Sequence, residues 1–243
     1  MDYSGSVSEK PTLYTAIPCN FCQRVKVALS AKGVAFDAVE IDLIRRPSWF
    51  REKASGGSVP LFEYEGGAIH GSAIVNEYID HRWPEPPLLP SDPFERASAR
   101  MFIDWWNRKG PTAPYEERLM NVRDAREKDV EARLETALEA CERRLEERGY
   151  DGGYWDGRGL NLVDCAAAPV FVRFAGLRHF HDFEIPSALG RVRAWHDALI
   201  ADPHVLATAP DEDRLFSMLA DYRVVLKKAA DAGIEVPVSS AGD

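Results

Sequence analysis

The sequence predicts an α/β N-terminal domain followed by an all-helical C-terminal domain. Over residues 11–82 the hydrophobic pattern changes between strand and helix periodicity in the order βαβαββα. Residues 83–93 contain five prolines, and such a stiff stretch between two different patterns predicts a linker. Residues 94–230 then show helical spacing and no strand pattern. A chain of 243 residues, 45% of them hydrophobic, can fill the cores of two such domains.

The N-terminal elements follow from local signals. "PTLYTAI" (11–17) predicts a strand, and residues 19–32 predict a helix that stops at Gly33. "VAFDAVEIDL" alternates like a second strand, and "RPSWFREKAS" predicts a short helix or turn. "SVPLFEYEGGAIHG" predicts a hairpin, and residues 72–82 predict a helix capped by Ser72. We expect the first two strands to pair in parallel and the hairpin to be antiparallel.

The C-terminal domain is predicted to consist of helices only. We expect helices over residues 94–107, 124–148, 161–177, 186–201 and 211–230. Gly110-Pro111 should kink or end the first of them. The second carries an apolar stripe formed by Val130, Leu134, Ala137, Leu138, Cys141 and Leu145. The third is apolar on nearly every face and should be central, with Asn161 and Asp164 placed as in a capping box. Residues 1–10 and 233–243 are predicted to be flexible tails.

Composition limits the classes of function. The net charge is −9, the pI is near 5.3, and basic residues are interleaved with acids, so nucleic acid is not an expected partner. No apolar stretch reaches the roughly 18 residues that a membrane span needs, and the first residues lack the pattern of a secretory signal. Four cysteines do not form a disulfide framework. We therefore expect a cytoplasmic protein that contacts no membrane.

The cysteine pair in "PCNFC" is the strongest chemical signal. Cys19 begins a predicted helix, where free backbone N–H groups and the helix dipole stabilise a thiolate. Cys22 lies one turn further and could resolve a disulfide formed at Cys19. A zinc site would need more ligands, and no second CxxC accompanies His179 and His181, so no metal is expected. Inert packing is the remaining alternative, and it fits Cys22 better than Cys19.

The order of motifs resembles the thioredoxin fold with an appended helical domain. Across about residues 11–230, the chain is similar to the cytosolic glutathione transferases, and in particular to the omega class and its bacterial relatives. The similarity lies in "PCNFCQRVKVALSAKGV", "RRPSWFREKASGGSVPLFE", "GSAIVNEYIDHRWPEPPLLPSDPFERA" and "NLVDCAAAPVFVRF". The C-terminal region also resembles bacterial glutathione lyases that cleave lignin-derived thioethers. The resemblance implies glutathione as co-substrate and a homodimer.

The resemblance also implies roles for individual residues. Cys19 would be the nucleophile, with Cys22 as an optional resolving thiol. The glutathione-binding residues would be Arg46 at the glycyl carboxylate, Val59 before a cis Pro60 at the cysteinyl amide, and Gly71 and Ser72 at the γ-glutamyl group. The family normally has an acid where this chain has Gly71, so another carboxylate, such as Glu77 or one of a partner subunit, would have to replace it. Aromatic residues between the domains would bind a second, hydrophobic substrate, and the candidates are Trp105, Trp106, Tyr115 and Tyr222.

The expected function is therefore removal of glutathione from mixed disulfides or glutathionyl thioethers by a cysteine nucleophile. One alternative is a transferase that conjugates glutathione to electrophiles, although a cysteine thiolate would compete with glutathione as the nucleophile. Another is a dehydroascorbate reductase. A third is a binding protein without catalysis, which the absence of the acid at Gly71 favours.

Overall fold

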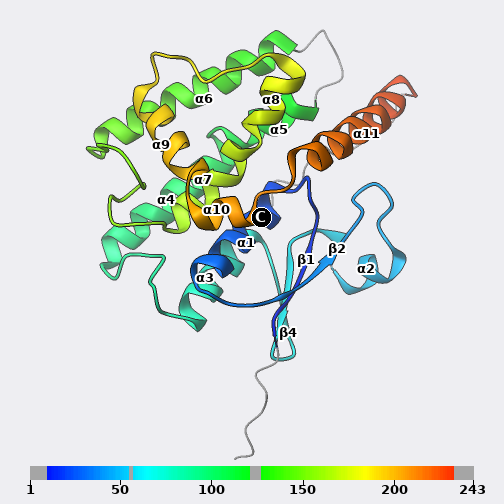
Figure 1. Cartoon of the computed structure of the whole chain (residues 1–243), viewed down its shortest axis with the longest axis horizontal. Helices are drawn as coiled ribbons and strands as arrows, with labels where there is room; N and C mark the ends of the chain where they lie inside the picture. The colour runs from blue at the N-terminus through cyan, green and yellow to red at the C-terminus, as the bar shows by residue number, and fades with distance from the viewer. Residues whose placement is uncertain (1–9, 55–56, 121–126, 233–243) are drawn as a thin grey trace, which may run out of the picture.

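The structure is a computed structural model that describes residues 10–54, 57–120 and 127–232 (Figure 1). The N-terminal domain has the predicted order βαβαββα, which confirms the thioredoxin-like fold. Its elements are β1 (Thr12–Thr15), α1 (Asn20–Ala31), β2 (Asp37–Glu40), α2 (Ser48–Lys53), β3 (Leu61–Tyr64), β4 (Gly67–His70) and α3 (Ser72–Arg82).

The four strands form one mixed sheet in the order β2-β1-β3-β4. As predicted, β1 and β2 are parallel, and β3 and β4 form an antiparallel hairpin. Helices α1 and α3 pack against each other and contact the helical domain. The short helix α2 covers a separate small core, where Phe50 packs with Tyr14, Ile41 and Leu61. Helix α1, which carries the cysteine pair at its start, therefore lies between the sheet and the second domain.

The C-terminal domain is all-helical in the residues described. Its helices are α4 (Pro93–Arg108), α5 (Thr112–Met120), α6 (Glu127–Glu147), α7 (Leu162–Val172), α8 (Phe174–His181), α9 (Gly190–Ile200), α10 (Pro203–Thr208) and α11 (Glu212–Asp231). The predicted stripe on α6 is buried throughout. The predicted start of α6 at residue 124 and the tails at 1–9 and 233–243 lie outside the described residues.

The first helix of this domain ends before Gly110-Pro111, as predicted, and α5 begins directly after it and carries Tyr115. Two expectations about helix boundaries were wrong. The predicted helix 161–177 is divided at Arg173, which ends α7 and begins α8. The helix expected from residue 186 begins at Gly190, and a separate helix, α10, follows it behind an Asp202 N-cap.

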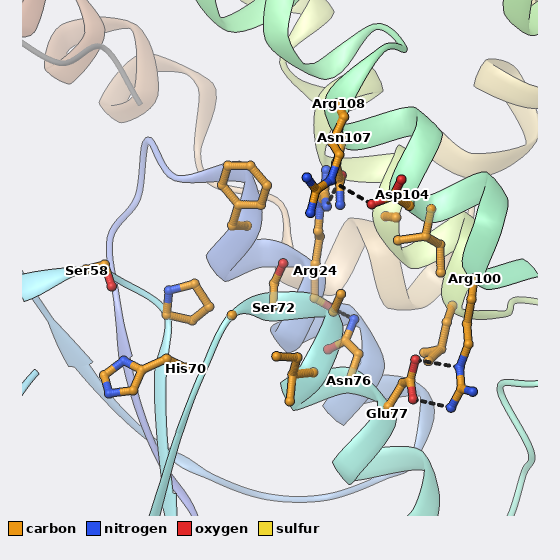
Figure 2. Close-up of a pocket in the computed structure, with 18 of the residues that line it drawn as sticks. Arg24, Ser58, His70, Ser72, Asn76, Glu77, Arg100, Asp104, Asn107 and Arg108 are labelled. Carbon is orange, nitrogen blue, oxygen red and sulfur yellow. Dashed lines mark hydrogen bonds and ion pairs between the residues drawn. The ribbon is translucent and has the colours of Figure 1, made fainter. Parts of the chain in front are cut away.

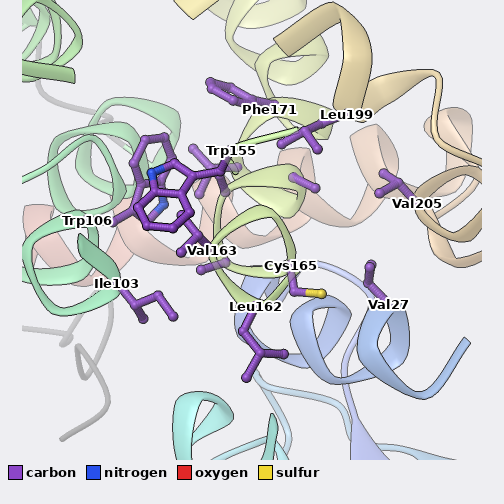
Figure 3. Close-up of a cluster of buried hydrophobic side chains, with 14 of the residues drawn as sticks. Val27, Ile103, Trp106, Trp155, Leu162, Val163, Cys165, Phe171, Leu199 and Val205 are labelled. Atoms are coloured by element: carbon purple, nitrogen blue, oxygen red, sulfur yellow. The ribbon is translucent and has the colours of Figure 1, made fainter. Parts of the chain in front are cut away.

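Helix α7 is the centre of the molecule, as its apolar composition predicts. Every residue from Leu162 to Phe171 is buried, and α7 packs against α1, α4 and α9. Figure 3 shows Cys165 on α7 beside Val27 on α1 and, on another side of the same helix, Trp106 and Trp155. One hydrophobic core thus includes residues of both domains, which fixes α1 relative to the helical domain.

The predicted capping box at the start of α7 is present. The Asn161 side chain accepts from the backbone N–H groups of Val163 and Asp164. The fully buried Asp164 carboxylate accepts from the Asn161 N–H at 3.1 Å, the Trp155 N–H at 2.9 Å and the Trp195 indole N–H at 2.8 Å. One carboxylate therefore satisfies three buried donors from three segments of the domain.

We predict that Asp164→Ala lowers the free energy of unfolding by about 3 kcal/mol, because three buried N–H groups lose their acceptor. Asp164→Asn should cost less, since its amide oxygen can still accept. Urea denaturation measures both. The control is Glu135→Ala on the exposed face of α6, which should change stability by no more than about 0.5 kcal/mol. A loss of less than about 1 kcal/mol for Asp164→Ala would contradict the role of Asp164 as the acceptor for three buried N–H groups.

Candidate active site

Cys19 lies at the junction of β1 and α1. It is the N-cap of α1, so the helix begins at Asn20, one residue later than the sequence suggested. Its backbone N–H donates to the Ala16 carbonyl, and its sulfur accepts from the backbone N–H of Cys22 at 3.4 Å. A thiolate here satisfies one of the unpaired N–H groups of the helix start, as an oxygen does in an ordinary N-cap.

The two cysteines have opposite electrostatic environments. A hydrogen bond from the Cys22 thiol is the largest cause that lowers the pKa of Cys19, and the Cys22 backbone N–H and the Arg173 guanidinium lower it further. Burial opposes this shift. Burial also raises the pKa of Cys22 well above its ordinary value, and the hydrogen bond to Cys19 adds to the effect. All four cysteines of the chain are free thiols. The pair is therefore suited to one thiolate, on Cys19, held by a protonated Cys22.

Val59 lies directly opposite Cys19. The Cys19 sulfur is 4.0 Å from the Val59 carbonyl oxygen, and the Val59-Pro60 peptide bond is cis, as the resemblance implied. Val59 and Pro60 also line a cavity of about 670 Å³ between the domains. The backbone of Val59 is thus placed between the thiol and this cavity.

The cavity is bounded by α1, the Val59 loop, α3 and α4 (Figure 2). Gly71 and Ser72 line it together with Phe21 and Arg24 from α1. From α4 it receives Arg100, Ile103, Asp104, Asn107 and Arg108. Three residues of the predicted glutathione site (Val59, Pro60 and Ser72) and the substituted Gly71 therefore share one cavity.

The start of α3 faces this cavity without a side-chain cap. The N-cap is Gly71, with a φ of 80°, and Ser72 is the first helical residue, so the predicted capping by Ser72 is wrong. A positive φ is easily adopted by glycine and strained for an acidic residue. Because Gly71 has no side chain to cap the first N–H groups, the helix end and the Ser72 hydroxyl are available to an anion in the described part of the chain.

The carboxylates that line the cavity are already paired. Glu77, the substitute suggested for the missing acid, accepts two hydrogen bonds from Arg100, and Asp104 pairs with Arg108 at 2.7 Å. Arg24 is buried and makes its hydrogen bonds to neutral groups, Asn107 Oδ1 at 2.6 Å and Thr112 Oγ1 at 3.4 Å. Burial lowers the pKa of Arg24 to about 10. The lining thus favours a negatively charged ligand group.

The other predicted binding residues do not line this cavity. Arg46 is exposed on the loop between β2 and α2, where its charge acts on Tyr222 of α11. Trp106 is fully buried in the helical core, and Tyr115 is buried on α5. Trp105 is partly buried against the core, beneath the Arg144 guanidinium. The structure therefore does not assemble Trp105, Trp106, Tyr115 and Tyr222 into one aromatic pocket in the described residues.

Sequence reasoning missed two buried arginines near the thiol. Arg24 follows the cysteine pair on α1, and Arg173 ends α7 after an apolar run. The Arg173 side chain donates to the carbonyl oxygens of Ile17 and Pro18 at 2.9 and 3.2 Å, and also to the Gln23 side chain. The only available signal was a charged residue inside an otherwise apolar pattern, which predicts a buried partner but does not identify it.

We predict that the Cys19 thiol titrates below the ordinary cysteine value near 8.5, because the Cys22 thiol and Arg173 favour the thiolate. The rate of alkylation by iodoacetamide should rise through this lowered pKa and then level off. Cys22, Cys141 and Cys165 should react slowly at neutral pH, since burial raises the pKa of each. Mass spectrometry of the labelled peptides separates the four sites. Labelling of Cys22 before Cys19 would contradict the assignment.

Comparison with known proteins agrees with this geometry. Residues 13–87 match the family model of the glutathione S-transferase N-terminal domain, and residues 97–198 match that of the C-terminal domain. The pig (Sus scrofa) glutathione S-transferase omega-1 is 30% identical over 227 residues, which cover 91% of this chain and 90% of the pig protein. Mouse (Mus musculus) omega-1 is 31% identical over 91% of this chain and 90% of its own.

Solved structures show the same fold. The crystal structure of glutathione transferase Omega 3C from Trametes versicolor has a TM-score of 0.76 and 27% identity, with 92% of this chain and 93% of that chain covered. Rice GST1 in complex with glutathione has a TM-score of 0.77 at 23% identity, with 92% and 98% covered. The two family models and the full-length relatives show that this chain belongs to the glutathione S-transferase family, with omega-class proteins among its relatives.

Proposed function

We propose that the protein is a cysteine-type glutathione transferase that removes glutathione from mixed disulfides or from glutathionyl thioethers. The observation that supports this most is the Cys19 thiol, which caps α1, accepts a hydrogen bond from the Cys22 backbone N–H and has a lowered pKa. A thiolate is the nucleophile of thiol–disulfide exchange. Conjugation of glutathione that is assisted by a protein hydroxyl group does not need a protein thiolate.

Glutathione is proposed to bind along the cavity. The bare start of α3 and the Ser72 hydroxyl would take the γ-glutamyl carboxylate, and Val59 would pair its backbone with the cysteinyl amide. In this proposed arrangement the glutathione sulfur would point toward Cys19, whose sulfur lies beside the Val59 carbonyl. Arg46, on its exposed loop, remains the candidate for the glycyl carboxylate.

The proposed chemistry has two steps. The Cys19 thiolate attacks the glutathione sulfur of a mixed disulfide, so that a Cys19–glutathione disulfide forms and the substrate leaves as a thiolate that takes a proton. With a thioether to the α-carbon of a ketone, the leaving group is the enolate, which is protonated on carbon. A second glutathione, as its thiolate, then attacks the mixed disulfide and releases glutathione disulfide and the Cys19 thiolate.

The remaining expectations are part of the same proposal. The second substrate is small and aromatic or hydrophobic, and it enters between the domains. The protein works as a homodimer in the cytoplasm, where its thiols stay reduced. The exposed apolar side chains of Ile74 on α3 and Met101 on α4 are candidates for the dimer contact. None of the described helices is long and apolar enough to cross a membrane.

We predict that Cys19→Ser abolishes glutathione-dependent reduction of a small glutathione mixed disulfide, a loss of at least about 100-fold, because a serine hydroxyl stays protonated at neutral pH. The measurement is glutathione disulfide release coupled to glutathione reductase. Retention on glutathione-agarose serves as the control, and the variant should still be retained. Turnover that survives the substitution would sink the assignment. A wild-type protein that neither turns over nor is retained would favour the non-catalytic binding protein.

Two variants of Cys22 separate its two proposed roles. Cys22→Ser keeps a hydrogen-bond donor but removes the resolving thiol, and with glutathione in excess its rate should match the wild type. Cys22→Ala removes the donor, which is the largest cause of the lowered Cys19 pKa, so its pH–rate profile should move to higher pH. A slow Cys22→Ser variant whose pH profile is unchanged would instead show that Cys22 resolves the intermediate.

A further inference from the structure

Arg173 links the helical domain to the loop that carries the active cysteine. It is 1% exposed and lies where α7 ends and α8 begins. Its Nη2 donates to the Ile17 carbonyl at 2.9 Å and its Nε to the Pro18 carbonyl at 3.2 Å. These are the two residues that immediately precede Cys19, so one planar guanidinium from the second domain holds the backbone that positions the thiol.

The charge of Arg173 has no carboxylate in contact with it among the residues described. Its third nitrogen, Nη1, donates to the Gln23 side chain and to the Pro169 carbonyl at 2.9 Å. All of these acceptors are neutral. A buried cation that is hydrogen-bonded but not neutralised is costly to keep, unless a negative charge forms nearby. Cys19 follows the clamped Ile17-Pro18 segment directly.

The other charged groups around Cys19 do not combine a positive charge with hydrogen bonds to the Ile17-Pro18 backbone. Arg24 and Lys26 lie on α1 itself, and Arg24 is fixed to α4 and α5 through Asn107 and Thr112. From α5, Glu116 opposes a thiolate, and Tyr115 is kept neutral because burial raises its pKa. The charged groups facing α1 from α3 and α10 lie at its far end, where Asp80 pairs with Lys32 and His204 contacts Ser30.

We propose that Arg173 is a positioning residue and a counter-charge of the Cys19 thiolate, so that docking of the helical domain contributes to activation of the thiol. The inference deepens the proposed function, on which it rests for the role of Cys19. It assigns to the C-terminal domain a part in the sulfur chemistry, in addition to any part in binding the second substrate.

The test is the pH dependence of Cys19 alkylation by iodoacetamide in the full-length protein without glutathione. Arg173→Met should raise the apparent pKa of Cys19 by about one pH unit, which slows alkylation roughly tenfold at pH values below it. Arg173→Lys keeps the charge and should restore most of the rate. Circular dichroism and urea denaturation identify any variant that fails to fold.

Two matched variants make the test specific. Arg24→Met removes another buried arginine from the same neighbourhood without touching the Ile17-Pro18 loop, and it should shift the pKa by less than half as much. Gln23→Leu removes one neutral partner of Arg173 and should leave the charge effect in place. An unchanged pKa in a folded Arg173→Met, or equal shifts in Arg173→Met and Arg24→Met, would overturn the proposal.

Because the readout needs neither glutathione nor substrate, the two proposals can fail separately. If Arg173→Met raises the pKa and the wild type shows no thiol transfer, the proposed function fails while the inference stands. If the wild type is active and the pKa does not depend on Arg173, the inference alone fails.

Discussion

The burial of α7 is the constraint on which the rest of the structure depends. A helix that is apolar on nearly every face cannot lie on a surface, so the chain must surround it on all sides. Helices α4 and α9 of its own domain cover part of it, and α1 of the N-terminal domain covers the side that carries Cys165. The two domains consequently share one core, and the start of α1 has a fixed position relative to the end of α7.

The electrostatic environment of Cys19 depends on this fixed position of α1 relative to the end of α7. A helix start alone would favour a thiolate by a modest amount, since the N-terminal dipole effect at an exposed site is typically about 0.3–1 kcal/mol. Here the Cys22 thiol and the Arg173 guanidinium act on the same sulfur, one from the next turn of α1 and one from the other domain. The asymmetry of the "CNFC" pair also follows, because Cys22 faces the interior where its charged form is disfavoured. A protonated Cys22 thiol can then donate a hydrogen bond to the thiolate form of Cys19.

The sequence predicted what depends on local signals and missed what depends on contacts between distant segments. The strand and helix order, the Asn161 capping box and the junction of Cys19 with α1 all follow from residues that are close to each other in the chain. Apart from Pro169, the hydrogen-bond partners of the Arg24 and Arg173 side chains are 83 to 156 residues away in the chain, and no local pattern identifies them. Trp106 was misjudged because an aromatic residue on an amphipathic helix has the same spacing whether it faces a core or a pocket. The capping by Ser72 failed because Gly71 takes the N-cap conformation at positive φ.

The same geometry determines what the start of α3 offers a ligand when Gly71 stands in place of an acid. A glycine adopts the φ of 80° without strain and leaves the first N–H groups of α3 free for a carboxylate. Arg24 adds a buried positive charge to the cavity, while Glu77 and Asp104 are engaged by their own arginines and offer little to an ammonium group. Recognition of a glutathione-like ligand would therefore rest on its carboxylates and on the backbone of Val59 more than on its amino group. Since the Val59 carbonyl also faces the Cys19 sulfur, a ligand held in the proposed way would present its own sulfur to Cys19 even when its amino end is loosely held.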